Sequence, residues 1–176
     1  MLIHLSIRDV VVIDRLDLEL GPGLCVLTGE TGAGKSILLD ALSLALGRRA
    51  EPGLVRRGAS KAVVTATFEV LLEHVARSML KTRGIPADGE LVVRRTLTSD
   101  GRSRAFVNDQ SVTIGFLAEL GVALLEIHGQ NDRLGLLDSR THRATLDMAG
   151  DLGDFLTRTE QAYDRWYAAH GLLTAG

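Results

Sequence analysis

The first part of the chain carries the hydrophobic pattern of β-strands. Apolar residues dominate residues 2–7 and 10–20, and in the second segment leucines alternate with Asp17 and Glu19. Alternation with a period of two is typical of a strand with one exposed face. Residues 24–28 form a short continuous apolar run after a Gly-Pro-Gly turn. We therefore predict a fully buried strand there.

The helical period first appears at residues 36–46, where apolar residues recur three and four positions apart. An aperiodic loop follows at 47–60. Beyond it, apolar and β-branched runs predict strands, and Gly121 is expected to end a short helix. The expected elements are strands at 62–70, 91–98, 102–107 and 122–127 and helices at 71–82 and 114–120, with turns at Asp100-Gly101 and Asn108-Asp109. These elements indicate an α/β fold.

The last part of the chain is patterned as helix alone. Ser139 is a candidate N-cap for a helix reaching residue 148, and Asp151 for a second helix. In the second helix a heptad seam is formed by Leu152, Leu156, Thr159, Tyr163, Trp166, His170 and Leu173. We therefore predict a globular lobe over residues 1–150 and the root of a coiled-coil helix over 151–176. Because the chain stops inside the seam, we expect it to be a fragment.

A phosphate-binding motif lies between the expected strand at 24–28 and the helix at 36–46. It reads Gly-Glu-Thr-Gly-Ala-Gly-Lys-Ser, the pattern G-x-x-x-x-G-K-[ST]. Its glycines allow a tight turn that directs backbone N–H groups at an anion, and the helix N-terminus adds partial positive charge. Lys35 would reach the β- and γ-phosphates, and Ser36 would place its hydroxyl on Mg²⁺. The predicted nucleotide contacts are Gly29, Glu30, Thr31, Gly32, Ala33, Gly34, Lys35, Ser36 and Ile37.

The composition is that of an ordinary globular chain, with 176 residues, 45% hydrophobic residues and a formal net charge of −2. There is no apolar run of membrane-spanning length and no signal peptide. The single Cys25 falls in the expected buried strand and favours a reducing, cytosolic setting. The His residues and this Cys are scattered, so we expect no metal cluster from them.

Basic residues gather in two stretches. The first contains Arg48, Arg49, Arg56, Arg57 and Lys61, opposed by Glu51 alone. The second contains Arg94, Arg95, Arg102 and Arg104, opposed by Asp100. Guanidinium groups suit bidentate phosphate contacts. We expect the first stretch to bind phosphate, either of DNA or of nucleotide, and the second to form a solvated surface.

The motifs that would complete a P-loop NTPase within one chain are missing. An acidic residue at the end of an apolar strand should hold Mg²⁺, and the nearest match, residues 122–126, ends in Glu126 and continues apolar at Ile127. Neither the guanine-reading motif N/T-K-x-D nor the signature motif of ABC ATPases occurs. The sequence thus contains the phosphate-binding motif of a nucleotide site but not its acidic strand or signature motif. Either another lobe supplies these parts, or the chain only holds nucleotide.

Four motifs, in this order, resemble the ABC-type heads of SMC-like proteins, and above all the bacterial RecN family of DNA-repair ATPases. They are the ETGAGKS loop, LVRRG at 54–58, SDGRSRAFVN at 99–108 and EIHGQ at 126–130. The resemblance covers about residues 1–150. It implies a P-loop fold of the type found in the N-terminal lobe of ABC ATPases, with a mixed β-sheet.

The resemblance also implies a head that is split along the sequence. The N-terminal lobe carries the P-loop and the Q-loop, a long coiled coil follows, and the C-terminal lobe of the same protein carries the signature motif, the Walker B strand and the catalytic Glu. Gln130 would be the Q-loop glutamine, catalytic together with Lys35 and a Mg²⁺ ligand together with Ser36. Without the resemblance, Gln130 would be read as a solvated loop residue. Arg56 or Arg57 would reach nucleotide or DNA.

The implied function is ATP hydrolysis that drives head engagement in DNA double-strand-break repair. Two heads would sandwich two ATP molecules in a homodimer, with DNA as a further partner and no membrane, in the bacterial cytoplasm at the nucleoid. One alternative is a free-standing P-loop small-molecule kinase whose lid is Arg-rich, but the heptads and the missing acidic strand argue against it. The other is an ABC transporter subunit, which would carry the signature motif in the same chain.

Overall fold

The computed structural model describes residues 1–29, 34–51, 53–127, 143, 146–147, 149–150 and 152–174, and of residues 171–174 only the backbone. The chain divides into two compact units, Met1–Ile127 and His128–Gly176. The first unit contains a β-sheet and the helix that follows the P-loop. The described part of the second contains one long helix.

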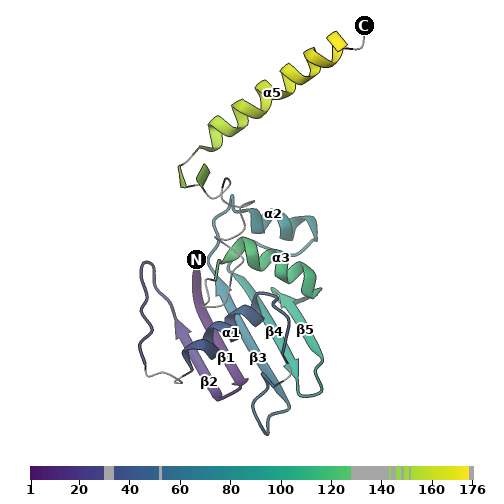
Figure 1. The fold of residues 1–176 in the computed structure, drawn as a ribbon. Helices are drawn as coiled ribbons and strands as arrows, with labels where there is room; N and C mark the ends of the chain where they lie inside the picture. Colours follow the sequence, from purple (N-terminus) through teal and green to yellow (C-terminus); the bar gives the residue numbers. More distant parts are fainter. Residues whose placement is uncertain are drawn as a thin grey trace. The chain divides into compact units, whose positions relative to one another are not determined.

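The first unit is built on a six-stranded sheet in which all neighbouring strands are antiparallel (Figure 1). The strands are β1 (Leu2–Val10), β2 (Ile13–Glu19), β3 (Lys61–Phe68), β4 (Leu91–Thr98), β5 (Ser103–Val107) and β6 (Gln110–Val112). Their order across the sheet is β2-β1-β3-β4-β5-β6. β1 therefore pairs with β3, although the P-loop segment and a helix separate them in the sequence.

One face of the sheet forms the hydrophobic core, because every second residue of a strand points to the same side. Leu5 and Ile7 of β1, Val64 of β3 and Val93 of β4 are almost fully buried on it. Three helices accompany the sheet: α1 (Lys35–Ala45), α2 (Val75–Thr82) and α3 (Ile114–Leu124). α1 crosses the core face over β1, β3 and β4, and α3 packs on β5 and on α2 (Figure 1).

Two glycines set the contact between α1 and α3. Gly47, just after α1, has a φ of +93°, and a Cβ placed on it would lie 2.4 Å from the backbone nitrogen of Ala118. Gly121 lies inside α3, and a Cβ placed on it would lie 2.4 Å from the carbonyl oxygen of Leu46. Atoms at these distances overlap, so the two helices meet backbone to backbone only because both positions are glycine.

The strand expected at residues 24–28 is absent. Leu24 and Val26 are exposed over 94% and 69% of their surface, and Cys25 is exposed rather than buried. A buried strand needs neighbours for its backbone groups and cover for its side chains. Within the described residues the sheet ends at β2 and β6, and no strand pairs with this segment.

The strand expected at residues 122–127 is also wrong. α3 continues through Gly121 as far as Leu124. The backbone first becomes extended at Leu125, which caps the helix. Gly121 therefore lies inside the helix, where its lack of a side chain allows the close approach to Leu46. Glu126 consequently does not follow a buried strand, as an acidic Mg²⁺ residue at a strand end would.

The turn expected at Asn108-Asp109 is confirmed, since both residues have positive φ, +44° and +61°. Asn108 fixes the turn: its Oδ1 accepts from the amide of Val92 over 2.8 Å, and its Nδ2 donates to the carbonyl oxygen of Pro86 over 2.7 Å. The turn leads into the short strand β6, which the sequence pattern did not indicate. Three residues are too few to show a period.

The second unit contains α5 (Gly153–Thr174). Three rings of the predicted heptad seam follow one another along it: the ring centroids of Tyr163 and Trp166 are 5.7 Å apart, and those of Trp166 and His170 are 5.2 Å apart. Tyr163 and Trp166 are exposed over 58% and 56% of their surface. The helix expected at 139–148 lies largely outside the described residues. No described helix is long and apolar enough to cross a membrane.

Candidate functional site

The N-terminal end of α1 offers hydrogen-bond donors to an anion. Gly34 occupies the N-cap with a φ of +89°, and no side chain caps the helix. A Cβ at Gly34 would meet no atom within 4 Å, so this glycine is required by its backbone conformation rather than by lack of space. The N–H groups of the first turn have no acceptor within the helix, and the helix dipole adds partial positive charge at this end.

The side chains of the first turn suit the same ligand. Lys35 Nζ donates a hydrogen bond to the carbonyl oxygen of Gly29, so the ammonium group lies at the start of the phosphate-binding loop. Ser36 is exposed, whereas Ile37 is half-buried and packs against the core. The first turn contains no acidic residue. Ile37 therefore anchors the helix, and Lys35 and Ser36 are left at its ligand end.

A nucleotide phosphate fits this combination of backbone donors, one ammonium group and one hydroxyl. A magnesium ion fits less completely, since Ser36 supplies a single oxygen and the remaining ligands would be phosphate oxygens and waters. Within the described residues, no three His, Cys, Asp or Glu side chains come together to hold a metal. The predicted contacts of Glu30, Thr31, Gly32, Ala33 and Gln130 lie outside the described residues and stay predictions.

The loop that follows α1 is fixed against the turn between β1 and β2. The amide of Val11 donates to the carbonyl oxygen of Leu54 over 2.9 Å, and the amide of Arg56 donates to that of Asp9 over 2.9 Å. Arg56 Nη1 also donates to Asp14 Oδ1 over 2.7 Å. The sequence pattern did not indicate Asp14 as a partner, because 42 positions separate it from Arg56.

Arg57 has a different environment from Arg56. It is exposed, and its side chain makes no hydrogen bond or ion pair within the described residues. The two arginines line a half-open cavity of about 510 Å³ between their loop and the β4–β5 hairpin. Arg48 and Arg49 line a separate hollow of about 70 Å³ beside α1. The first basic stretch is thus spread over more than one surface, and the contacts of Arg56 lead to the first hairpin rather than to the P-loop.

The second basic stretch does not form one surface either. Arg95 is only 1% exposed in the core, where its Nε donates to Ser103 Oγ over 2.7 Å. Its Nη1 has no hydrogen-bond partner among the described residues, and burial lowers the pKa of this guanidinium below its usual value. Arg94 points to the other side of the sheet and pairs with Asp109 over 2.9 Å. The expected solvated surface is therefore wrong for Arg95, because β4 turns neighbouring side chains to opposite faces.

Known proteins are similar to this chain over most of its length. A family model described as an AAA domain matches residues 4–141. The DNA repair protein RecN of Vibrio cholerae is 40% identical over 173 residues, which are 98% of this chain and 31% of that protein. RecN of Halalkalibacterium halodurans is 42% identical over 148 residues, which are 84% of this chain and 26% of that protein. The chain spans between about a quarter and a third of the length of these relatives.

Solved structures share the fold. An SMC ATPase studied for ATP-driven dimerisation and DNA-stimulated activation has a TM-score of 0.57 at 23% identity, covering 83% of this chain and 97% of the other. The Smc head domain of Pyrococcus furiosus was solved with an extended coiled coil and the C-terminal domain of ScpA. It has a TM-score of 0.62 at 20% identity, and the match covers 93% of this chain and 45% of that chain. These similarities confirm the predicted α/β fold of an N-terminal ABC-ATPase lobe.

Proposed function

Because this chain belongs to the AAA domain family, we propose that it is the ATP-binding N-terminal lobe of an SMC-like head in a bacterial DNA-repair protein. One observation carries the proposal. The start of α1 presents Gly34, Lys35 and Ser36 to an anion, while the apolar approach to the loop, with Leu24 and Val26, is exposed. The first feature is a phosphate site, and the second is a surface that a further lobe would cover.

The residues of this chain would have different roles at the nucleotide. The first-turn N–H groups and Lys35 bind and orient the β- and γ-phosphates, and Gly34 keeps the backbone close to them. Bound Mg²⁺ would neutralise charge on the phosphates, with the Ser36 hydroxyl and Gln130 as its protein ligands. Gln130 would also position the attacking water. Arg56 or Arg57 would reach the nucleotide or DNA from the loop after α1.

Catalysis requires groups that this chain does not provide in its described part. We infer that a C-terminal lobe of the same protein adds strands beside residues 24–28, together with the acidic strand and the catalytic Glu. A second head would close on the nucleotide in a homodimer, and α5 would be the root of the coiled coil. ATP hydrolysis would then drive head engagement during double-strand-break repair on nucleoid DNA in the cytoplasm. The relatives described above give no support to a small-molecule kinase.

The variant Lys35→Ala tests the nucleotide site. It removes the ammonium group at the phosphate end of α1, and charge-assisted contacts of this kind are worth about 1.5–3 kcal/mol each. We expect the affinity for a fluorescent ATP analogue to fall by about tenfold or more, with an unchanged circular dichroism spectrum. Lys81→Ala, at an exposed position of α2, is the matched control and should bind as the wild type does. Equal affinity in the wild type and Lys35→Ala would reject the loop as the site.

A further inference from the structure

The cavity between the loop after α1 and the β4–β5 hairpin is large enough for a ligand of its own. Its volume of about 510 Å³ lies within the range of about 300–1,000 Å³ that is usual for ligand pockets. The residues at the start of α1, Gly34, Lys35 and Ser36, are not among those that line it. A ligand in this cavity would therefore occupy a site separate from the phosphate site.

The inner wall of the cavity is aliphatic. Leu97 lies on the core face of β4 and is only 3% exposed, and the half-buried Ala50, Val55 and Ala59 complete the wall. None of the described residues that line the cavity is aromatic, so a nucleobase would find no ring to stack on. The wall suits an aliphatic side chain instead.

Arg57 brings a free positive charge to this wall. It follows Val55 by two positions, in a turn that the amide of Ala59 closes by donating to the carbonyl oxygen of Arg56 over 3.0 Å. Arg57 is exposed, and its side chain makes no hydrogen bond or ion pair within the described residues. The guanidinium of Arg56 is instead paired with Asp14. Arg57 is thus open to an anion, and its planar guanidinium suits a carboxylate.

Two carboxylates limit the charge that the cavity accepts. Glu51 and Asp100 both line it, and Arg102 Nε pairs with Asp100 Oδ2 over 3.1 Å. Glu51 is exposed, and its side chain has no ion pair within the described part of the chain. A phosphate monoester carries close to two negative charges and a nucleic acid carries a whole row of them. Both would be repelled by these carboxylates, so a single carboxylate group is the better match.

The buried Arg95 adds positive charge close to the aliphatic wall. Its Nε donates to Ser103 Oγ over 2.7 Å, and Ser103 stands directly opposite Leu97 in the sheet. Directly opposed residues share a face, so the guanidinium lies beside the Leu97 side chain. Its Nη1 has no hydrogen-bond partner among the described residues. A buried charge acts over a longer range than an exposed one, because water screens it less.

We propose that this cavity binds the C-terminal residue of a partner polypeptide. The terminal carboxylate pairs with Arg57, and an aliphatic side chain packs against Leu97 and Val55. A C-terminal residue carries both groups on one Cα, as the short separation between Arg57 and Val55 requires. An internal Asp or Glu carries its charge at the tip of its own side chain, and in an extended peptide its neighbours point the other way. This site goes beyond the proposed ATP function.

Peptides that differ only at the C-terminus test the proposal. The probe is fluorescein-labelled Ser-Gly-Ser-Gly-Ser-Leu, followed by anisotropy as it is titrated with the full chain. A lost charge-assisted contact should make the C-terminal amide of this peptide bind at least tenfold more weakly than the free acid. Arg57→Gln should bind the acid and the amide equally. Arg104→Gln, on the opposite face of the same hairpin, removes the same charge and should bind as the wild type does.

The variant Ala59→Phe tests the aliphatic wall, because its ring would fill part of the cavity. It should lower the affinity for the free-acid peptide at least tenfold, whereas its affinity for ATP and its circular dichroism spectrum should not change. Several results would overturn the proposal: no binding of the peptide by the wild type, equal affinity for acid and amide, or equal affinity for peptides ending in Leu and in Ser. ATP binding by the same wild-type sample reports on the proposed function separately.

Discussion

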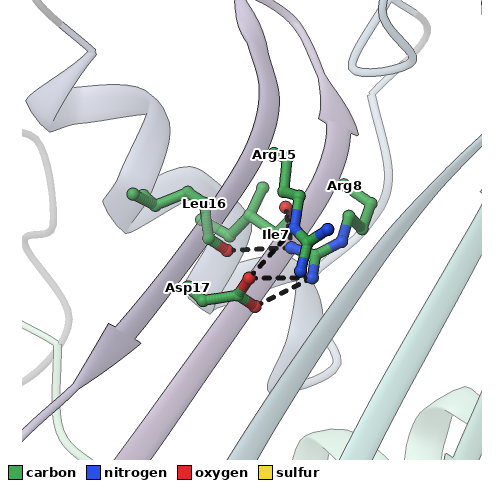
Figure 2. A network of polar contacts seen from close by, with 5 residues as sticks. All are labelled: Ile7, Arg8, Arg15, Leu16 and Asp17. Atoms are coloured by element: carbon green, nitrogen blue, oxygen red, sulfur yellow. Dashed lines mark hydrogen bonds and ion pairs between the residues drawn. The ribbon is translucent and has the colours of Figure 1, made fainter.

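At the scale of single residues, the contacts around Asp17 show how a surface carboxylate is held ionised. The hydrogen bond from Arg8 is the largest cause, and with Ser6 and Arg15 it lowers the pKa of Asp17 from 3.8 to about 2. Arg8 also donates to the carbonyl oxygens of Ile7 and Leu16 over 3.0 and 3.1 Å (Figure 2). The arginine therefore ties β1 to β2 through both side chain and backbone.

The variant Arg8→Gln tests this arrangement by its pH dependence. Asp17 has a lower pKa in the folded chain than in the unfolded chain, so its contribution to stability is complete above about pH 4 and is lost as the pH falls towards 2. We expect the carboxyl carbon of Asp17 to titrate near pH 2 in the wild type and closer to 3.8 in Arg8→Gln, as followed by NMR. Arg158→Gln should leave the midpoint unchanged. A wild-type midpoint near 3.8 would contradict the contact.

At the scale of elements, the junction of α1 and α3 fixes how the P-loop helix sits on the sheet. The variant Gly121→Ala places a Cβ 2.4 Å from the carbonyl oxygen of Leu46. This overlap should outweigh the better helix propensity of alanine and destabilise the fold by about 1–3 kcal/mol. The measurement is urea unfolding followed by circular dichroism.

Gly115 provides the matched control within the same helix. A Cβ on Gly115 meets no atom within 4 Å, so Gly115→Ala should be neutral or stabilise the fold by up to about 1 kcal/mol. Opposite signs for the two glycines are expected from the packing. Stabilisation by both substitutions would show that α3 does not approach α1 at Gly121.

The sequence predicted correctly those strands and helices that are specified by their own period and turn residues. The helix after the P-loop and the hairpin of β4 and β5 were recognised, because period and turn residues specify them. Residues 24–28 were predicted to form a strand but do not, since a strand depends on neighbours that the described part of the chain does not supply. The site shows the same division: Gly34 and Lys35 follow from the motif, whereas the pair of Arg56 with Asp14 depends on tertiary folding. The prediction that Gly121 ends the helix was wrong, because the sequence does not distinguish a glycine that allows close packing from one that ends a helix.

At the scale of the whole molecule, the two faces of the sheet in Met1–Ile127 differ. The core face of the sheet is covered by α1, whereas Leu24 and Val26 on the way to the P-loop are exposed. The opposite side of the sheet carries Arg8 and Arg15 on β1 and β2, and Arg104 on β5. The exposed apolar residues fit the proposed lobe, which would receive its partner lobe beside the nucleotide.

The central claim is that the chain binds ATP but hydrolyses it only when a second lobe completes the site. The most direct measurement is phosphate release by residues 1–176 alone and by the complete protein, each as wild type and as Lys35→Ala. We expect negligible release by the chain alone, despite nucleotide binding, and Mg²⁺-dependent release by the complete protein that Lys35→Ala abolishes. Turnover by residues 1–176 alone at the rate of the complete protein would contradict the account.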